Sequence, residues 1–374
     1  MSVYDPYKVR LFIVLWASII AVVALACGGG GIASMEDGRG DHTATLLADG
    51  RLLVAGGRDS KAIASVEVYD STTGEWTASS PMAAARFGHT QTLLEDGTVL
   101  VVGEASPELY NPVSGTWSSA GNMAYMREER HATTLLEDGR VLVTGGISEI
   151  DGFKETVGFA ELYDPPTKTW EPTGDMTEER ERHQAVLLKN GTVLVVGSRN
   201  DKPYIIGETT AELFDPATGT WSEASKLPND HGERFTVTLL DDGRVLVGGG
   251  GTRGRTLAPN ITASMDIYDP PTGEWSNLGD MTSKSWGHTA TTLRNGTILF
   301  VGMVFVDIYN PNTGTWTRVG ELTEARNGLH TATLLENDTV LIVGGDNITY
   351  GRTGNVGGRE GLSSVRVYDP AEEW

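Results

Sequence analysis

The chain has 374 residues and a formal net charge of -21, with 50 acidic residues against 29 lysines and arginines. Such an acidic protein is a poor partner for nucleic acid or anionic lipid, because phosphate binding depends on clustered basic side chains. Its one cysteine is Cys27, so no intrachain disulfide is available and packing must hold the fold together.

The first 27 residues are predicted to be a targeting segment. Lys8 and Arg10 precede an uncharged run at residues 11–26. That run is long enough for the core of a signal peptide and short for a membrane span. We therefore place the start of the chain outside the folded domain.

The end of this segment resembles the lipobox of bacterial lipoproteins. The run closes on Val-Ala-Leu-Ala-Cys at Cys27, although Ala24 stands where that motif more often has leucine. The resemblance implies cleavage before Cys27 and lipidation of its thiol, with glycines 28–31 as a flexible tether. A short uncleaved anchor is the alternative, and both interpretations predict an exported protein held at the membrane, at the cell surface or in the periplasm.

Seven copies of one sequence block fill the rest of the chain. Each copy opens on a His-Thr-Ala-Thr-Leu-Leu-like run and passes through an Asp-Gly or Asn-Gly turn and a Gly-Gly pair to a Tyr-Asp-Pro-like turn and a tryptophan. A repeat of this size, with several short strands and no helical pattern, predicts propeller blades. The copies start at His42, His89, His131, His183, Phe235, His288 and His330, and their tryptophans are Trp76, Trp117, Trp170, Trp221, Trp275, Trp316 and Trp374.

The third copy shows the strands expected within one blade. Apolar runs at residues 132–136 and 141–144 flank Asp138-Gly139, a pair that suits a type I′ hairpin turn. A third strand is expected at residues 160–163 and a fourth from Trp170. One such sheet cannot bury both of its faces, so neighbouring blades must stack, with the repeated aromatic residues between them.

Six of the seven histidines occupy the repeat-start position, which raises the question of a metal site. Packed sheets stand about 10 Å apart, whereas zinc ligands lie about 2 Å from their ion. Equivalent residues on neighbouring blades therefore converge too poorly for one ion, and we interpret these histidines as packing or hydrogen-bonded residues. No metal, cofactor or catalytic residue is assigned.

The Gly-Gly pair, the aromatic residue before Asp-Pro and the spaced tryptophan resemble the kelch repeat over residues 42–374. The resemblance implies an all-β fold, a seven-bladed propeller of four-stranded antiparallel blades. It leaves the activity open, because such propellers include oxidases, epimerases, ubiquitin-ligase adaptors and cytoskeletal cross-linkers. Copper-radical oxidases of the galactose oxidase type need a Tyr-Cys cross-link, and the only cysteine here lies in the leader.

The last copy stops at its tryptophan, without the residues that continue into an outer strand elsewhere. Met35, within residues 32–36, precedes His42 with the spacing that Met82 has before His89. We expect residues 32–36 to supply the outer strand of blade seven, so that one domain spans residues 32–374. Closure of this kind removes exposed strand edges.

One face of the expected ring carries the features of a binding surface. The loop after each Gly-Gly pair and the link before each repeat start open there, and loops of different length over a uniform scaffold are typical of a binding face. Arginines close to the repeat starts predict recognition of carboxylate, acidic-sugar or acidic-peptide ligands, and local pairing with neighbouring glutamates is the alternative. These arginines are Arg39, Arg86, Arg130, Arg180, Arg182, Arg234 and Arg326.

These observations favour a non-catalytic binding or scaffolding module for a protein, peptide or glycan ligand. We expect a monomer that is displayed at the membrane surface and has no nucleic-acid partner. The alternative is a sugar-active enzyme of the sialic-acid mutarotase or oxidase type that works in the arginine-rimmed mouth, where acid-base chemistry needs only a carboxylate and an arginine.

Overall fold

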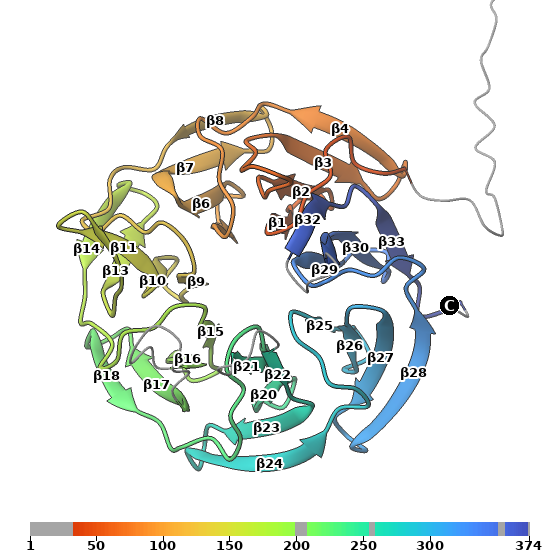
Figure 1. Cartoon of the computed structure of the whole chain (residues 1–374). Helices are drawn as coiled ribbons and strands as arrows, with labels where there is room; N and C mark the ends of the chain where they lie inside the picture. The colour runs from red at the N-terminus through yellow and green to blue at the C-terminus, as the bar shows by residue number, and fades with distance from the viewer. Residues whose placement is uncertain (1–32, 199–207, 254–258, 351–355, 373–374) are drawn as a thin grey trace, which may run out of the picture. The chain divides into compact units, whose positions relative to one another are not determined.

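Seven antiparallel β-sheets surround a central axis in the computed structural model (Figure 1). The described residues belong to one compact unit and contain no helix, so none of them forms a helix able to span a membrane. The predicted all-β, seven-bladed propeller is confirmed. The predicted leader, Cys27 and the glycine tether lie outside the described residues. The structure describes residues 33–198, 208–253, 259–350 and 356–372.

Each blade runs from an innermost strand at the axis to strands nearer the rim (Figure 1). The innermost strands are β1 (Thr43–Leu46), β5 (Thr90–Leu93), β9 (Ala132–Leu135), β15 (Gln184–Leu187), β19 (Thr236–Leu239), β25 (Thr289–Thr292) and β29 (His330–Leu334). The second strands are β2 (Leu52–Ala55), β6 (Val99–Gly103), β10 (Val141–Thr144), β16 (Val193–Ser198), β20 (Val245–Gly248), β26 (Ile298–Val301) and β30 (Val340–Gly344).

Six blades have four described strands, and blade seven has three. The third strands are β3 (Val66–Asp70), β7 (Ala105–Asn111), β13 (Ala160–Asp164), β17 (Thr209–Asp215), β23 (Ser264–Asp269), β27 (Phe305–Asn310) and β33 (Val365–Tyr368). The outer strands are β4 (Glu75–Ser79), β8 (Thr116–Ser119), β14 (Thr169–Pro172), β18 (Thr220–Glu223), β24 (Glu274–Asp280) and β28 (Thr315–Glu321).

The Asp-Gly turns differ from the predicted type I′ geometry. In blade one Gly50 donates to the carbonyl of Leu47 at 3.0 Å, and Leu47 donates to the carbonyl of Arg51 at 2.8 Å. Gly50 has a φ of 82°, whereas Asp49 is not in the left-handed region. This is a three-residue connection in which a type I turn is followed by a left-handed glycine, the other common hairpin solution. Glycine is favoured there because its backbone adopts that conformation without strain, although Asp338 takes the same position in blade seven with a φ of 67°.

Each seam between neighbouring blades has its own cluster of buried apolar side chains. Between blades one and two, Leu53 packs with Val99 and Val101, and the Tyr110 and Trp117 rings stack against this seam with their centroids 5.0 Å apart. The second strands are covered on both faces, which explains their nearly unbroken apolar sequences. Seven clusters fill the seven seams.

The seam between blades seven and one closes the ring. Met35 is buried there between strands β2 and β30, and its backbone N–H donates to the carbonyl of Ser363 at 3.1 Å. The Trp76 indole donates to the carbonyl of Ala33, as the Trp117 indole donates to that of Ser80. Residues 33–36 therefore match a blade link. None of residues 33–36 lies in a strand, which corrects the expectation that they form the outer strand of blade seven, and Ile32 lies outside the described residues.

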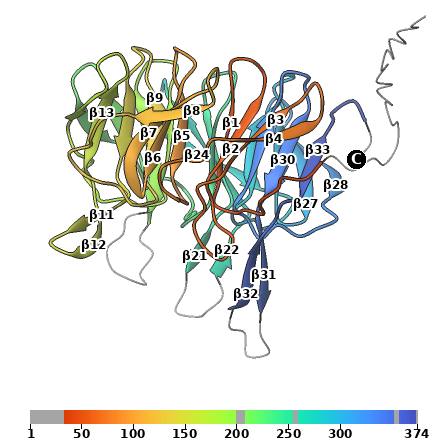
Figure 2. The same ribbon diagram turned by 90° about the horizontal axis from the view of Figure 1, so that it is seen from above.

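Three hairpins project from one face of the ring, here called the hairpin face (Figure 2). The sequence predicted loops of different length after the Gly-Gly pairs, and the structure shows that three of the four long ones form paired strands. The fourth, in blade four, lies largely outside the described residues. The hairpin strands are β11 (Ile147–Ile150) with β12 (Phe153–Thr156), β21 (Gly251–Arg253) with β22 (Pro259–Ile261), and β31 (Asp346–Tyr350) with β32 (Val356–Gly361).

Candidate functional site

Seven residues of the blade links form a ring around the axis at the hairpin face. Each immediately precedes a repeat start, and each has a left-handed backbone with φ between 55° and 71°. Hydrogen bonds join the ring from blade to blade, such as Arg182 N–H to Arg130 C=O at 2.8 Å and Gly287 N–H to Arg234 C=O at 3.0 Å. This backbone costs a non-glycine residue about 1–2 kcal/mol, which the surrounding structure must offset. The ring residues are Asp41, Gly88, Arg130, Arg182, Arg234, Gly287 and Leu329.

The ring surrounds a cavity of about 300 Å³, the mouth, which three of the predicted arginines line: Arg130, Arg182 and Arg234. The left-handed backbone at these three residues sets the direction of their Cα–Cβ bonds. Arg58, which the sequence analysis missed, also lines the mouth, and its guanidinium lies 4.4 Å from the centre of the Phe87 ring. Arg58 directly follows a Gly-Gly pair, and that position was the available signal.

Ion pairs between blades balance the charge of the mouth. Arg130 donates to Glu181 at 2.8 Å, and Arg182 donates to Glu233 at 2.7 Å, so each arginine reaches a carboxylate one blade further on. These side chains are 19–29% exposed, so the pairs are open to solvent. Beside them, burial raises the pKa of Glu104. The mouth therefore presents paired charges of both signs, which suits a ligand with mixed charge more than a purely anionic one.

The other four predicted arginines are inside the blades, which corrects their assignment as ligand-binding residues. Arg86 shows why: its guanidinium donates to the carbonyl of Gly103 at 2.9 Å and to that of Ser106 at 3.3 Å, and pairs with Glu108. Desolvation lowers the pKa of Arg86 despite that carboxylate. Arg39, Arg86, Arg180 and Arg326 are at most 1% exposed, so solvent and ligands do not reach them.

We call this arrangement the arginine cradle. Its guanidinium is held by a carbonyl at or just after the end of the second strand and by a carbonyl just before or near the start of the third. In blades one to four, a glutamate on the third strand pairs with it. In blade three the cradle arginine is Arg127, paired with Glu161 at 3.2 Å. Arg127 was not predicted, because Arg130 lies directly beside the repeat start and Arg127 does not. In blade five His231 takes the position, between Gly249 O at 2.9 Å and Asp266 at 3.1 Å.

The six repeat-start histidines form a buried set near the axis, and two of them, His131 and His183, also line the mouth. His89 shares a hydrogen bond with the Thr43 hydroxyl at 2.7 Å, and His183 with that of Thr144 at 2.8 Å. All six bond to a threonine of the preceding blade in this way. Desolvation, together with a nearby cradle arginine, lowers the pKa of His89 and of His183 to about 3. These histidines therefore join blades and are neutral at physiological pH.

Comparison with known proteins supports the repeat assignment. The Kelch motif model matches residues 41–83. Kelch-like protein terF of Aspergillus terreus is 29% identical over 48% of this chain and 40% of its own length. Kelch-like protein 25 of Xenopus tropicalis is 24% identical over 61% of this chain and 39% of its own length. The matches thus span about two fifths of these relatives, and the chain carries a kelch repeat motif.

A solved structure shares the fold. A fungal alcohol oxidase in complex with copper superposes with a TM-score of 0.69 and 19% identity, covering 90% of this chain and 76% of its own. At this identity the likeness establishes the propeller alone. Among the described residues no three histidine, cysteine, aspartate or glutamate side chains are placed to hold a metal ion together, and each repeat-start histidine is bonded to a threonine.

The histidine set predicts a steep loss of stability in acid. The ordinary histidine pKa is 6.5, and burial lowers the pKa of His131 and His288, like that of His89, to about 3 in the folded protein. Between these pH values the unfolded chain binds more protons, so stability falls as pH falls. Each histidine contributes a slope of about 1.4 kcal/mol per pH unit in this window. Urea unfolding at a series of pH values measures the total slope.

His131→Gln separates this effect from the titration of carboxylates. Glutamine keeps a polar partner for Thr90 but takes up no proton, so the slope between pH 6 and 4 should decrease by about one proton. Above pH 7.5 the variant and the native chain should have parallel pH profiles. An unchanged slope in the variant would contradict a neutral, buried histidine at this position.

Proposed function

We propose that this chain is a non-catalytic binding module whose hairpin face docks a protein, peptide or glycan partner. The observation that carries the proposal is the contrast between the two faces. Three stiff hairpins of different length surround the charged mouth on one face, whereas the other face repeats the same short turns seven times. A rigid scaffold that varies on one face only is the usual design of a recognition surface.

Exposed apolar side chains lie on the same face. Phe153 at the turn of the β11–β12 hairpin is 70% exposed, and Met126 and Tyr125 in the adjoining link are 45% and 38% exposed. The Tyr125 ring stacks on Phe159 with centroids 4.2 Å apart, which holds it in place. Apolar groups beside paired charges are typical of the centre of a protein interface. Kelch-repeat propellers are commonly protein-interaction modules, which supports the same conclusion.

The geometry of the mouth supports docking more than the sugar-active alternative. A general acid or base needs a carboxylate or histidine that reaches the substrate. Here Glu181 and Glu233 are each bridged to an arginine, and the two histidines that line the mouth, His131 and His183, are buried and bonded to threonines. The similarity to the solved oxidase structure supports the propeller fold alone and carries no argument for an oxidase activity.

A peptide and glycan array probed with the full chain tests the docking proposal. We expect ligands whose binding falls at least tenfold in Phe153→Ser, because truncation of an exposed aromatic anchor removes a central contact. Val113→Ser is the matched control, because Val113 is 97% exposed on the opposite face. No ligand on either array, or equal losses in the two variants, would overturn the proposal.

We further propose that the chain is exported and tethered at the membrane surface through Cys27. The uncharged run at residues 11–26 and the lipobox-like Val-Ala-Leu-Ala-Cys support this. Cys27→Ser should move the protein from the membrane fraction to the soluble fraction of a bacterial host and abolish its labelling by a clickable fatty acid. A Cys27→Ser protein that stays membrane-bound and unprocessed would favour the uncleaved anchor instead.

A further inference from the structure

Blade six lacks the arginine of the cradle. Ser285 occupies its backbone position: Gly250 N–H donates to the Ser285 carbonyl at 2.8 Å, as Gly57 N–H donates to the Arg86 carbonyl at 2.9 Å. In every other blade an arginine or, in blade five, His231 fills this position. The serine side chain is too short to bring a donor to where the guanidinium lies in those blades.

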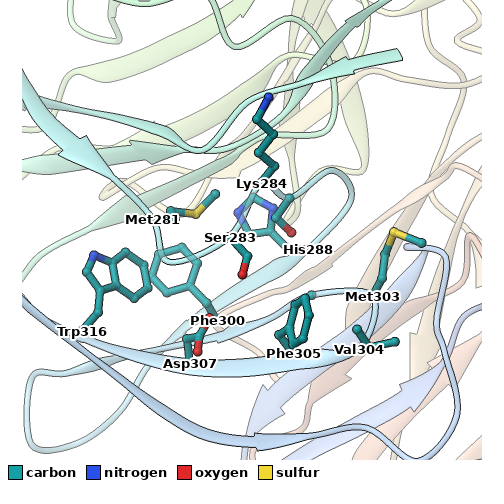
Figure 3. Close-up of a pocket in the computed structure, with 12 residues that line it drawn as sticks. Met281, Ser283, Lys284, His288, Phe300, Met303, Val304, Phe305, Asp307 and Trp316 are labelled. Atoms are coloured by element: carbon teal, nitrogen blue, oxygen red, sulfur yellow. The ribbon is translucent and has the colours of Figure 1, made fainter. Parts of the chain in front are cut away.

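A cavity of about 180 Å³ is found where the arginine is missing (Figure 3). Three of its lining residues, Gly302, Phe305 and Asp307, are the cradle residues of blade six. Gly302 N–H bonds to the Phe305 carbonyl at 2.8 Å, as Gly56 N–H bonds to that of Ser65 in blade one at 3.1 Å. In blade one both of the equivalent carbonyls accept from Arg39 Nη1 at 3.0 Å. Blade six therefore keeps the acceptors of the cradle without its donor.

Much of the rest of the wall is apolar, and its polar members are Ser283, Lys284, Ser285 and His288. Met281, Phe300 and Trp316 line one side and Phe305 and Met303 the other, as the close-up shows. Such a wall suits the aliphatic stem of an arginine, which buries its methylenes while its head group stays polar. The cavity therefore combines an apolar passage with a group of hydrogen-bond acceptors.

Arg318 already binds the cradle carboxylate from the outside, and Lys284 lines the cavity, so cations already lie near the site. Its Nε lies 2.7 Å from Asp307 Oδ1, and its side chain is 39% exposed. Blade seven shows that a second cation nearby is tolerated. There Arg366 takes the acidic position, yet Arg326 is held by the carbonyls of Gly344 and Ser364. Burial lowers the pKa of Arg326 to about 10, with Glu324 opposing the shift and Arg366 adding to it, so Arg326 is still protonated at neutral pH.

We propose that the blade-six cavity binds an arginine side chain that a partner polypeptide presents. The guanidinium would replace the missing donor at Gly302, Phe305 and Asp307, since its planar fork matches two carbonyls and a carboxylate. The site is reachable from the hairpin face: blade six has a short connection there, and Met303 at the rim is 38% exposed. This inference rests on the proposed docking function and specifies one contact of the partner, an arginine side chain in the blade-six cavity.

Calorimetric titration of the full chain with N-acetyl-L-arginine amide tests the site. Arginine amide should bind at least tenfold more tightly than N-acetyl-norleucine amide, which offers the same stem without a donor. Ser285→Arg should fill the cradle, abolish this binding and raise the melting temperature. Equal affinity for the two probes would mean an apolar cavity only, and unchanged binding in Ser285→Arg would place the site elsewhere. Either result, or the absence of binding, would overturn the proposal.

Arg86→Ser provides a reciprocal test, because it should open an equivalent cradle in blade two. We expect the stoichiometry for arginine amide to rise from one to two and the lowered melting temperature to recover partly with added ligand. A folded Arg86→Ser chain that binds no second ligand would contradict the cradle argument. If that variant does not fold, the Ser285→Arg result decides alone.

The outcomes also separate this inference from the docking proposal. Arginine amide that binds in a Ser285-dependent manner, with no ligand found on the arrays, would support the cradle and refute the wider docking face. Array ligands that lack arginine and bind equally to the Ser285→Arg chain would support docking and refute the cradle.

Discussion

Burial of each sheet on both faces is the constraint on which the rest of the structure depends. A blade has strands of four to seven residues, far too little to enclose its own second strand. The residues of β2, β10, β20 and β26 are buried throughout because the neighbouring blades cover them. Seven separate cores, one for each seam, take the place of a single one, and Met35 contributes to the seam that joins the last blade to the first.

A second, polar pattern is superimposed on this packing. The arginine cradle fixes the link between blades to the third strand of the next blade, because its guanidinium donates to two backbone carbonyls there, as Arg39 does to those of Gly56 and Ser65. A buried arginine and carboxylate contribute little net stability by themselves, but removal of one partner leaves the other desolvated and unpaired. Such a pair therefore specifies the position of the link. Blades five, six and seven depart from the arginine–glutamate pair of the cradle. Apolar packing between the blades does not explain these departures, so they point to a local role for the residues concerned.

Much of the fold was predictable because the same pattern of strands and turns recurs in seven copies of the sequence block. In blade three the expected strands at residues 132–136, 141–144 and 160–163 agree with the observed ones within one residue. The Asp-Gly turn was placed correctly and given the wrong type, since glycine suits the left-handed position of both hairpin turns. The hairpins were taken for loops because their short strands lack an alternating apolar pattern.

The site was less predictable, because spacing along the chain does not determine burial. Arg127 and Arg130 are three residues apart, and one lies inside blade three while the other lines the mouth. What separates them is the left-handed backbone at Arg130 and the carbonyls that surround Arg127, both of which depend on the assembled ring. Likewise Ser285 is unremarkable in the sequence, and its significance follows only from the arginines at the same place in other blades.

Hydrogen exchange of the backbone amides tests ring closure most directly. In a closed ring no blade is terminal, so the amides of β2 and β30 should exchange as slowly as those of β16, through the same global opening. An open stack would fray from its ends. Amides in β2 and β30 that exchange orders of magnitude faster than those in β16 would contradict the account.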